Sequence, residues 1–163
     1  MALRIVYATA EHASLLMDMI KELAEFEKIP HGPTITIDRL ADDLSKEHVF
    51  GLVAYEGETP VGMSLYYLAY STWEGQFIHM EDLYVRPDFR KKGYGKALWS
   101  EIAKLSKEKG MTRLEWSVLN WNTNAIDFYK QMGAKDLHAT GGWLNFRLGR
   151  DGIVRLAANA QNT

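Results

Sequence analysis

Residues Met80 to Lys96 read MEDLYVRPDFRKKGYGK, a stretch that joins a strand to a helix. The apolar run from Leu83 to Val85 favours a strand, and Pro87 ends it because proline cannot donate a hydrogen bond to a strand ladder. Gly93 and Gly95 then come directly before an apolar helical pattern, so the N–H groups of a helix N-terminus, where the macrodipole is positive, are open to an anion. The stretch therefore predicts an anion-binding cradle.

Basic side chains on the approach to the two glycines make phosphate the expected anion. Arg90, Lys91 and Lys92 can add charge-assisted hydrogen bonds to phosphate oxygens. A Walker motif is absent, and a dinucleotide fingerprint would need a third glycine where Leu98 stands. The pattern R-x-x-G-x-G that begins at Arg90 resembles the coenzyme A pyrophosphate loop of the GNAT acetyltransferase superfamily.

Length and composition predict one domain over residues 1–163. A chain of 163 residues can bury about 68 to 70 per cent of its unfolded surface without disulfides, and it has no cysteine to form them. Its 19 basic and 21 acidic residues give a net charge of −2, which argues against a nucleic-acid partner. The apolar runs are strand-sized and no signal peptide is recognisable, so we expect a soluble cytoplasmic protein with no membrane partner. The histidines show no ligand spacing, and we expect no metal.

Periodicity and breaker residues indicate an α/β chain. Strands are expected over residues 3–7, 49–56, 60–70, 76–85 and 113–118, with two further short strands at 135–138 and 143–148 completing the sheet. Helices are expected after Thr9 to about Glu27, after Thr36, over 94–109 and over 125–132. Residues 157–163 are small and polar, and we expect them to fray.

Further stretches are similar to one branch of the superfamily, the diamine (spermidine/spermine) acetyltransferases with their thialysine-acetylating relatives. These stretches are Ile20–Glu27, Met80–Val85, Trp121-Asn122, Ala125–Ala134 and Gly142-Trp143, so the similarity covers nearly the whole chain. The resemblance implies a single-domain GNAT fold, in which a mixed, mostly antiparallel sheet of roughly seven strands, flanked by helices, splays between the strands that end at Val85 and Val118. It also implies acetyl-CoA as the donor and a homodimer.

The chemistry of amine acetylation needs a proton acceptor and a proton donor. An alkylammonium must lose its proton before it attacks a thioester, which costs roughly 4 to 5 kcal/mol at pH 7. Strand alternation points Glu81 and Asp82 to opposite faces, so at most one of them faces the cleft. The resemblance implies that it is Glu81, which acts as the base, and that Asp82 is structural; a surface carboxylate is the alternative role for Glu81. The resemblance also implies that Tyr129 is the acid for the leaving CoA thiolate, although packing beside Phe128 is an alternative role for its ring.

The resemblance assigns the remaining site residues. Contacts to acetyl-CoA are expected from Leu83, Tyr84, Val85, Arg90, Lys91, Lys92, Gly93, Tyr94, Gly95, Lys96, Asn122 and Asn124. Asn122 could instead cap its helix. Phe26, Glu27 and Glu81 are expected to contact the amine, since an aromatic ring and carboxylates favour an alkylammonium.

The acceptor amine is left open by the sequence. Polyamine-acetylating members often carry an acidic pair before the tryptophan that matches Trp143, whereas this chain reads Thr140-Gly141-Gly142, so a shorter diamine, a polyamine and a lysine-like amine such as thialysine all stay candidates. Two other functions remain open, an acetyltransferase for protein lysines or N-termini and a catalytically silent CoA-binding module.

Overall fold

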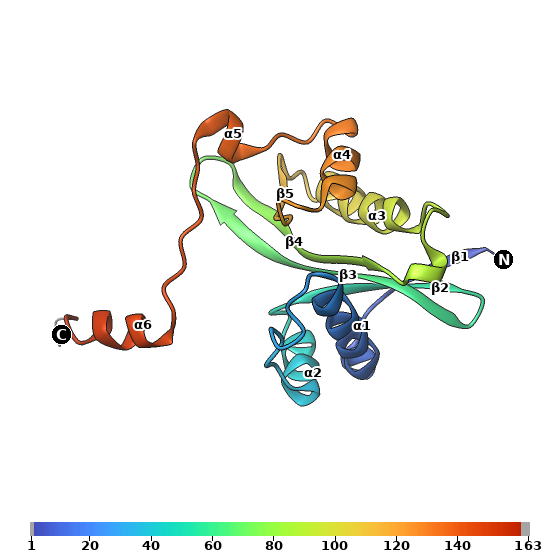
Figure 1. The fold of residues 1–163 in the computed structure, drawn as a ribbon, viewed down its shortest axis with the longest axis horizontal. Coiled ribbons are helices and arrows are strands. Elements are labelled where there is room, and N and C mark those ends of the chain that lie inside the picture. Colours follow the sequence, from blue (N-terminus) through green and yellow to red (C-terminus); the bar gives the residue numbers. More distant parts are fainter. Residues whose placement is uncertain (1, 161–163) are drawn as a thin grey trace. The chain divides into compact units, whose positions relative to one another are not determined.

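The computed structural model describes residues 2–160 and divides the chain into two compact units, Met1–Leu119 and Asn120–Thr163. The first unit contains the whole sheet, with strands in the order β1-β2-β3-β4-β5 (Figure 1). Its strands are β1 (Leu3–Tyr7), β2 (Phe50–Glu56), β3 (Thr59–Ser71), β4 (Gly75–Val85) and β5 (Leu114–Trp116). Neighbours from β1 to β4 are antiparallel, and β5 is parallel to β4. The α/β class and the mixed, mostly antiparallel sheet expected from the sequence are therefore confirmed.

Helices cover both faces of this sheet (Figure 1). On one face lie α1 (Ala13–Phe26), which follows the 3-10 turn η1 (Ala10–His12), and α2 (Ile37–Ser45); their buried side chains form one core cluster with Met63 and Leu65 of β3. On the other face α3 (Tyr94–Glu108) buries Leu98 and Ile102 in a second cluster. This placement follows from the apolar spacing of each helix, since residues three and four apart share one helical face.

Single residues mark the ends of several helices and strands of the first unit. Thr36 caps α2, because its hydroxyl oxygen accepts a hydrogen bond from the Arg39 N–H at 3.1 Å. Gly57 has φ +61° in the two-residue turn that joins β2 to β3, and Gly110 has φ +67° just after α3. These turns set the lengths of the strands and helices that carry the site.

Arg86 fixes the second half of α1 against the end of β4. Its guanidinium lies 2.9 Å from the Glu22 carboxylate of α1 and donates to the Pro60 carbonyl of β3 at 2.9 Å. Both charged side chains are partly buried, so this ion pair is less screened than a surface pair. The end of α1 is therefore held next to the segment of β4 that precedes the cradle.

A β-bulge at Glu81 changes which face of the sheet the residues of β4 point to. The register there pairs Leu65 with Asp82 and Tyr66 with Met80. Glu81 is thus the extra residue, and the alternation shifts by one position after it. Ile78, before the bulge, packs in the cluster on the α3 side; after the bulge Leu83 packs there, and Tyr84 packs on the α1 side.

The second unit contains α4 (Thr123–Gln131), α5 (Leu137–Gly141) and α6 (Arg150–Ala157). The strand predicted over 135–138 is wrong, because Asp136 caps α5 by accepting hydrogen bonds from the N–H groups of His138 and Ala139. The strand predicted over 143–148 is also wrong, since this segment is in no described strand. The described sheet therefore has five strands, and the larger number expected is wrong.

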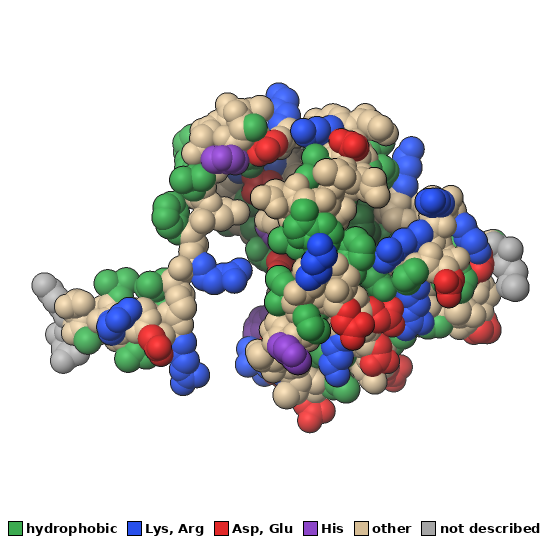
Figure 2. Space-filling view, viewed as in Figure 1, with side chains coloured by type: hydrophobic (Ala, Val, Ile, Leu, Met, Phe, Trp, Pro, Cys, Tyr) green, Lys and Arg blue, Asp and Glu red, His purple; other side chains and the backbone are tan. Residues whose placement is uncertain are grey.

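Large apolar side chains of the second unit are exposed along residues 143–156, several of them over α6 (Figure 2). They are Trp143, Leu144, Phe146, Leu148, Ile153, Val154 and Leu156. Phe146 is 92% exposed, which is far from the usual burial of phenylalanine. Helix α6 was not expected from the sequence, and of the segment predicted to fray, residues 161–163 lie outside the described part.

Within residues 2–160, the helices of the structure are each too short or too polar to span a lipid bilayer.

Candidate active site

The sheet opens between β4 and β5 at the bulge. The parallel pairing of these strands ends at Met80 and Trp116, whereas β4 continues to Val85 with β3 as its partner. In the described part of the chain, the edge of residues 81–85 that faces away from β3 therefore pairs with no strand. A free edge of this kind can accept an extended ligand as an added strand. This opening agrees with the splay expected near Val85, although β5 ends two residues before Val118.

The loop after β4 leads into the N-terminus of α3. A 3-10 turn, η2 (Pro87–Phe89), follows the strand, and Lys91 and Gly93 then take positive φ angles of +63° and +84°. Left-handed residues of this kind turn successive N–H groups toward one side, which forms a concave anion site. Gly93 is the N-cap of α3 and has no side chain with which to satisfy the first N–H groups of that helix. The backbone here has the form that the cradle requires.

Gly95 is a position where the fold itself does not demand glycine. A Cβ atom added there would meet Val85 Cγ2 at 3.7 Å, which is an ordinary van der Waals distance, and its φ is not positive. Gly62 of β3 is a useful contrast, because a Cβ there would lie 2.7 Å from the Tyr84 carbonyl oxygen. Glycine at 95 thus keeps the space outside the α3 N-terminus open, as a closely approaching pyrophosphate would need.

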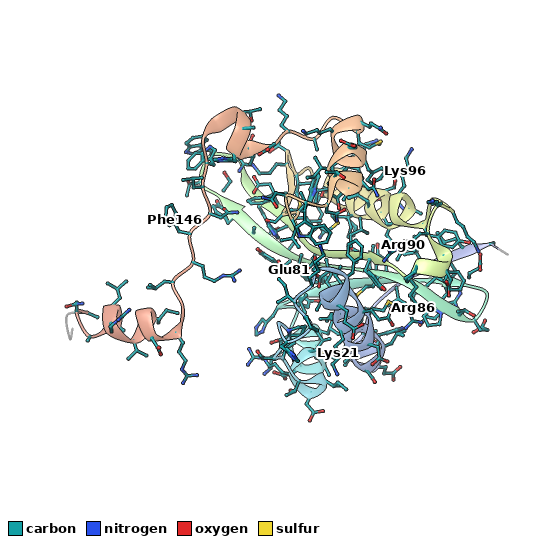
Figure 3. The ribbon with its side chains drawn as sticks, viewed as in Figure 1. Lys21, Glu81, Arg86, Arg90, Lys96 and Phe146 are labelled. Atoms are coloured by element: carbon teal, nitrogen blue, oxygen red, sulfur yellow. The ribbon has the colours of Figure 1, made fainter. Side chains whose placement is uncertain are left out.

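Protein groups engage two of the basic side chains predicted to approach the cradle. The Lys92 ammonium lies 3.0 Å from the Glu56 carboxylate, which also accepts a hydrogen bond from the Tyr94 hydroxyl. These bonds, first that of Tyr94 and then that of Lys92, lower the pKa of Glu56. Arg90, which is labelled in Figure 3, donates from Nε to the Val85 carbonyl at 2.8 Å. Lys96 lies in the first turn of α3 with its side chain exposed.

Three carboxylates gather at the other end of the free edge. Glu81 lies in the bulge, Asp82 follows it, and Glu27 comes directly after α1. Burial, followed by the charges of Glu81 and Glu27, raises the pKa of Asp82 to about 7. Burial and then the charge of Glu81 also raise the pKa of Glu27. A cation placed among these groups would relieve their mutual repulsion.

The structural role expected of Asp82 stays a prediction. The expectation that Glu81 and Asp82 point to opposite faces depends on strict strand alternation, and the bulge at Glu81 interrupts the alternation at this point. The sequence carries a signal of the bulge, because the apolar residues at 78, 80, 83 and 85 change phase between Met80 and Leu83. Read in this way, the pattern would have placed Asp82 on the side of α1.

His79 lies beside Glu81 and is stacked on an aromatic ring. Its Nε2 is 3.7 Å from Glu81 Oε2, and its ring centroid is 4.9 Å from that of Tyr67. The sequence suggests only a surface or packing role for this histidine.

The remaining candidate residues lie on α4 in the second unit. Asn122 is the N-cap of α4 and accepts a hydrogen bond from the Ala125 N–H at 3.4 Å, so the predicted capping role is confirmed. Asn124 is the second residue of α4 and is exposed. Tyr129 is half-buried with its ring 5.6 Å from that of Phe128, and burial raises the pKa of its hydroxyl. The phenol therefore stays protonated at neutral pH, as a proton donor must.

Within residues 2–160, no group of three or more His, Cys, Asp or Glu side chains has an arrangement that could hold a metal ion.

Comparisons with known proteins agree with this geometry. The model of the "Acetyltransferase (GNAT) family" matches residues 16–134. A thialysine N-epsilon-acetyltransferase of Caenorhabditis elegans is 46% identical over 153 residues, which cover 94% of this chain and 96% of that protein. Its name confirms the branch that the sequence motifs resemble.

Solved structures share the fold. An integron cassette protein of Vibrio cholerae superposes with a TM-score of 0.76 at 24% identity, over 96% of this chain and 98% of that one. An aminoglycoside N-acetyltransferase in complex with CoA superposes with a TM-score of 0.70 at 17% identity, over 91% and 95% of the two chains. With the family match over most of the chain and this fold, the protein belongs to the GNAT family of acetyltransferases and is an N-acetyltransferase.

Proposed function

We propose that the protein transfers the acetyl group of acetyl-CoA to a primary amine of a small diamine, a polyamine or a lysine-like amine such as thialysine. Acetyl transfer to an amine follows from the family and from the similarity to the worm enzyme, and the name of that relative supports thialysine among the acceptors. The observation that carries the choice of a cationic acceptor is the acidic group of Glu27, Glu81 and Asp82, in which burial and then neighbouring charges raise the pKa of two members. An alkylammonium is the complement of such a site.

Acetyl-CoA would bind through the backbone that the structure leaves open. The N–H groups around Gly93 and Gly95 would receive the pyrophosphate, with Lys91, Lys92 and Lys96 near it. The free edge of Leu83, Tyr84 and Val85 would pair with the pantetheine arm as an added strand. Asn122 and Asn124 remain candidates for further contacts to the coenzyme.

Glu81 is proposed as the general base. It takes one proton from the ammonium, either directly or through a water, and the neutral nitrogen attacks the thioester carbonyl. The N–C bond forms, the nitrogen loses its second proton to solvent, and the C–S bond then breaks, so that the products, once the thiolate is protonated, are the N-acetylated amine and CoA thiol. Support comes from the position of Glu81 in the bulge, beside the free edge and next to Glu27 and Asp82.

Tyr129 is proposed as the general acid, which gives its phenolic proton to the leaving thiolate and regains one from solvent. The raised pKa of its hydroxyl supports this role, because a buried phenol is protonated until a strong base appears beside it. The motif around α4 is the second support, since its residues match the branch at the position of its acid.

The experiment is an amine panel with acetyl-CoA, read by the release of free thiol. The panel holds a short diamine, spermidine, thialysine, a lysine-containing peptide and a peptide with a free N-terminus. Rapid release with the small amines is the expected result. Release with the peptides alone would favour an enzyme that acts on proteins, and no release despite CoA binding would favour a silent binding module.

Replacement of Tyr129 by Phe tests the acid within the same assay. The ring still packs while the hydroxyl is lost, so turnover should fall by about 10² to 10⁴ with an unchanged melting temperature and CoA affinity. Phe128→Leu, which alters the neighbouring ring and keeps the hydroxyl, is the matched control. Equal turnover of Tyr129→Phe and the wild type on the better substrate would refute the role.

We also propose that the two units belong to one acetyltransferase domain and that the protein is a homodimer. The family match runs from residue 16 to 134, across the boundary between Leu119 and Asn120, which supports a single domain. The exposed apolar residues of 143–156 support the dimer, because a second copy of the chain would remove them from water. Sedimentation should give twice the monomer mass, and Phe146→Glu should shift it toward the monomer.

A further inference from the structure

The side chain of Arg90 reaches from the cradle loop to the end of α1. Its Nε donates to the Val85 carbonyl at 2.8 Å, and its guanidinium carbon lies 5.0 Å from the centroid of the Phe26 ring and 5.7 Å from that of Tyr84. Both distances are within the range in which a cation is attracted to an aromatic face. The guanidinium therefore has contacts on the edge expected to hold the coenzyme and on the helix next to the acidic group.

Phe26 is the last residue of α1, and Glu27 of the acidic group follows it directly. The Phe26 side chain is 40% exposed, so solvent reaches part of it. An alkylammonium drawn to Glu27 and Glu81 would be attracted to the same aromatic face for the same electrostatic reason as the guanidinium. Arg90 and the acceptor amine are thus two cations with one aromatic partner.

Arg90 would also compete with the coenzyme for the Val85 carbonyl. A ligand that pairs with residues 83–85 as an added strand needs the outward carbonyls of this edge, and Arg90 holds that of Val85. A pyrophosphate at the α3 N-terminus, in turn, would attract the guanidinium more strongly than a neutral carbonyl and a ring do. Binding of the coenzyme would therefore displace Arg90 from the Val85 carbonyl and attract its guanidinium to the pyrophosphate.

We propose that Arg90 is a positioning residue that couples the two substrate sites through Phe26. Coenzyme A draws the guanidinium away from Val85 and Phe26, and the freed ring face then receives the ammonium of the acceptor. This inference rests on the proposed function for the identity of the acceptor. By linkage, the amine must also tighten CoA binding by the same factor by which CoA tightens amine binding.

The test is calorimetric and uses CoA, which lacks the acetyl group, so that both ligands can bind without reaction. In the wild type the dissociation constant for thialysine should be about 2- to 5-fold lower in the presence of saturating CoA than in its absence, the size expected for a cation–aromatic contact. Phe26→Leu should abolish this difference and weaken thialysine binding to the CoA complex. Phe26→Tyr, which keeps the aromatic face, should preserve the difference.

A second titration keeps the inference separate from the proposed function. CoA alone should bind Phe26→Leu about 2- to 3-fold more tightly than the wild type, because Arg90 no longer has to leave the ring. This measurement needs no amine, so it stands even if the amine panel fails. Equal CoA affinities for wild type, Phe26→Leu and Phe26→Tyr, or thialysine coupling that survives in Phe26→Leu, would overturn the inference. Thermal melting of each variant verifies that the chain is folded.

Discussion

The pKa values of the carboxyl groups at the two ends of the free edge of β4 are shifted in opposite directions. At the cradle, Glu56 pairs with Lys92 and its pKa is lowered, whereas at the bulge burial and like charges raise the pKa of Asp82 to about 7. The cradle has part of its charge compensated before any ligand arrives, so backbone shape has a large part in its binding. In the acidic group the pKa of Glu27 and Asp82 is raised instead, so this group would be stabilised by a cation. Under the proposed function, the coenzyme end would be organised in advance and the acceptor end would be completed by its substrate.

The largest expected effect is a loss of turnover on substitution at the acidic end, with no loss of CoA affinity. Glu81→Gln should lower turnover at pH 7 by about 10² to 10³, because the amine loses its base, while CoA affinity stays the same. The deficit should shrink toward pH 10, where free amine is abundant without help. Rates measured from pH 7 to pH 10 test this, and a constant deficit over that range would contradict the base role. Glu25→Gln, an exposed carboxylate on α1, is the control and should retain full activity.

A smaller effect is expected at the cradle, and it should appear in affinity. Gly95→Asp places a side chain and a negative charge against the pyrophosphate, so the CoA dissociation constant should rise by about 10- to 100-fold. Because a Cβ at this position meets Val85 Cγ2 at an ordinary 3.7 Å, folding should be unaffected.

Gly95→Ala is the matched control for this variant, since it adds the Cβ without the charge and should lose less affinity. Calorimetry with CoA measures both variants. Unchanged affinity of Gly95→Asp would show that the pyrophosphate binds elsewhere.

The smallest effect concerns stability at the acidic end. Folding raises the pKa of Asp82 from 3.8 to about 7, so the folded chain binds a proton that the unfolded chain releases between these values. This stabilising contribution is complete below about pH 4 and is lost as the pH rises through about 7. Asp82→Asn cannot ionise, and its melting temperature at pH 8 should exceed that of the wild type by about 2 to 6 °C, with a smaller difference at pH 5, where only part of the contribution is lost.

Melting curves of Asp82→Asn and of the exposed control Asp88→Asn at both pH values would measure this difference. A gain for Asp82→Asn of the same size at pH 5 and pH 8 would mean that Asp82 is not the group responsible. The result would sharpen the contrast with the cradle, where the pKa of Glu56 is shifted in the other direction.

Sequence patterns predicted the first unit better than the second, for reasons visible in single residues. The strand stop at Pro87, the turn at Gly57 and the N-terminus of α3 at Gly93 depend on intrinsic backbone preferences, which local sequence reveals. Residues 143–148 alternate as a strand does, but a strand also needs a partner, and partnership is not a local property. The cap at Asp136 was a local signal for α5 that the apolar pattern outweighed.

The residues of the candidate site also differ in how far local sequence could predict them. Glu81 and the glycines of the cradle became candidates through motifs, because the chemistry proposed for them is tied to short spacings. The partners of Arg90 and Lys92 could not be found in this way, since Phe26 and Glu56 are 64 and 36 residues away from them in the chain. Contacts at such separations are created by the folded sheet and its helices.

The bulge at Glu81 sets the faces to which the last residues of β4 point. Removal of Glu81 would place Asp82 directly after Met80 and join the two halves of the strand in a single period of two, with Asp82 to Val85 on the faces that they now occupy. Leu83 and Val85 would stay in the α3-side cluster, and Tyr84 would stay in the α1-side cluster. If the strand instead lost its bulge while Glu81 was kept, every side chain from Asp82 to Val85 would exchange faces, and both cores would lose side chains. The extra residue therefore carries a carboxylate that a deletion could remove without moving a core side chain to the other face of the sheet.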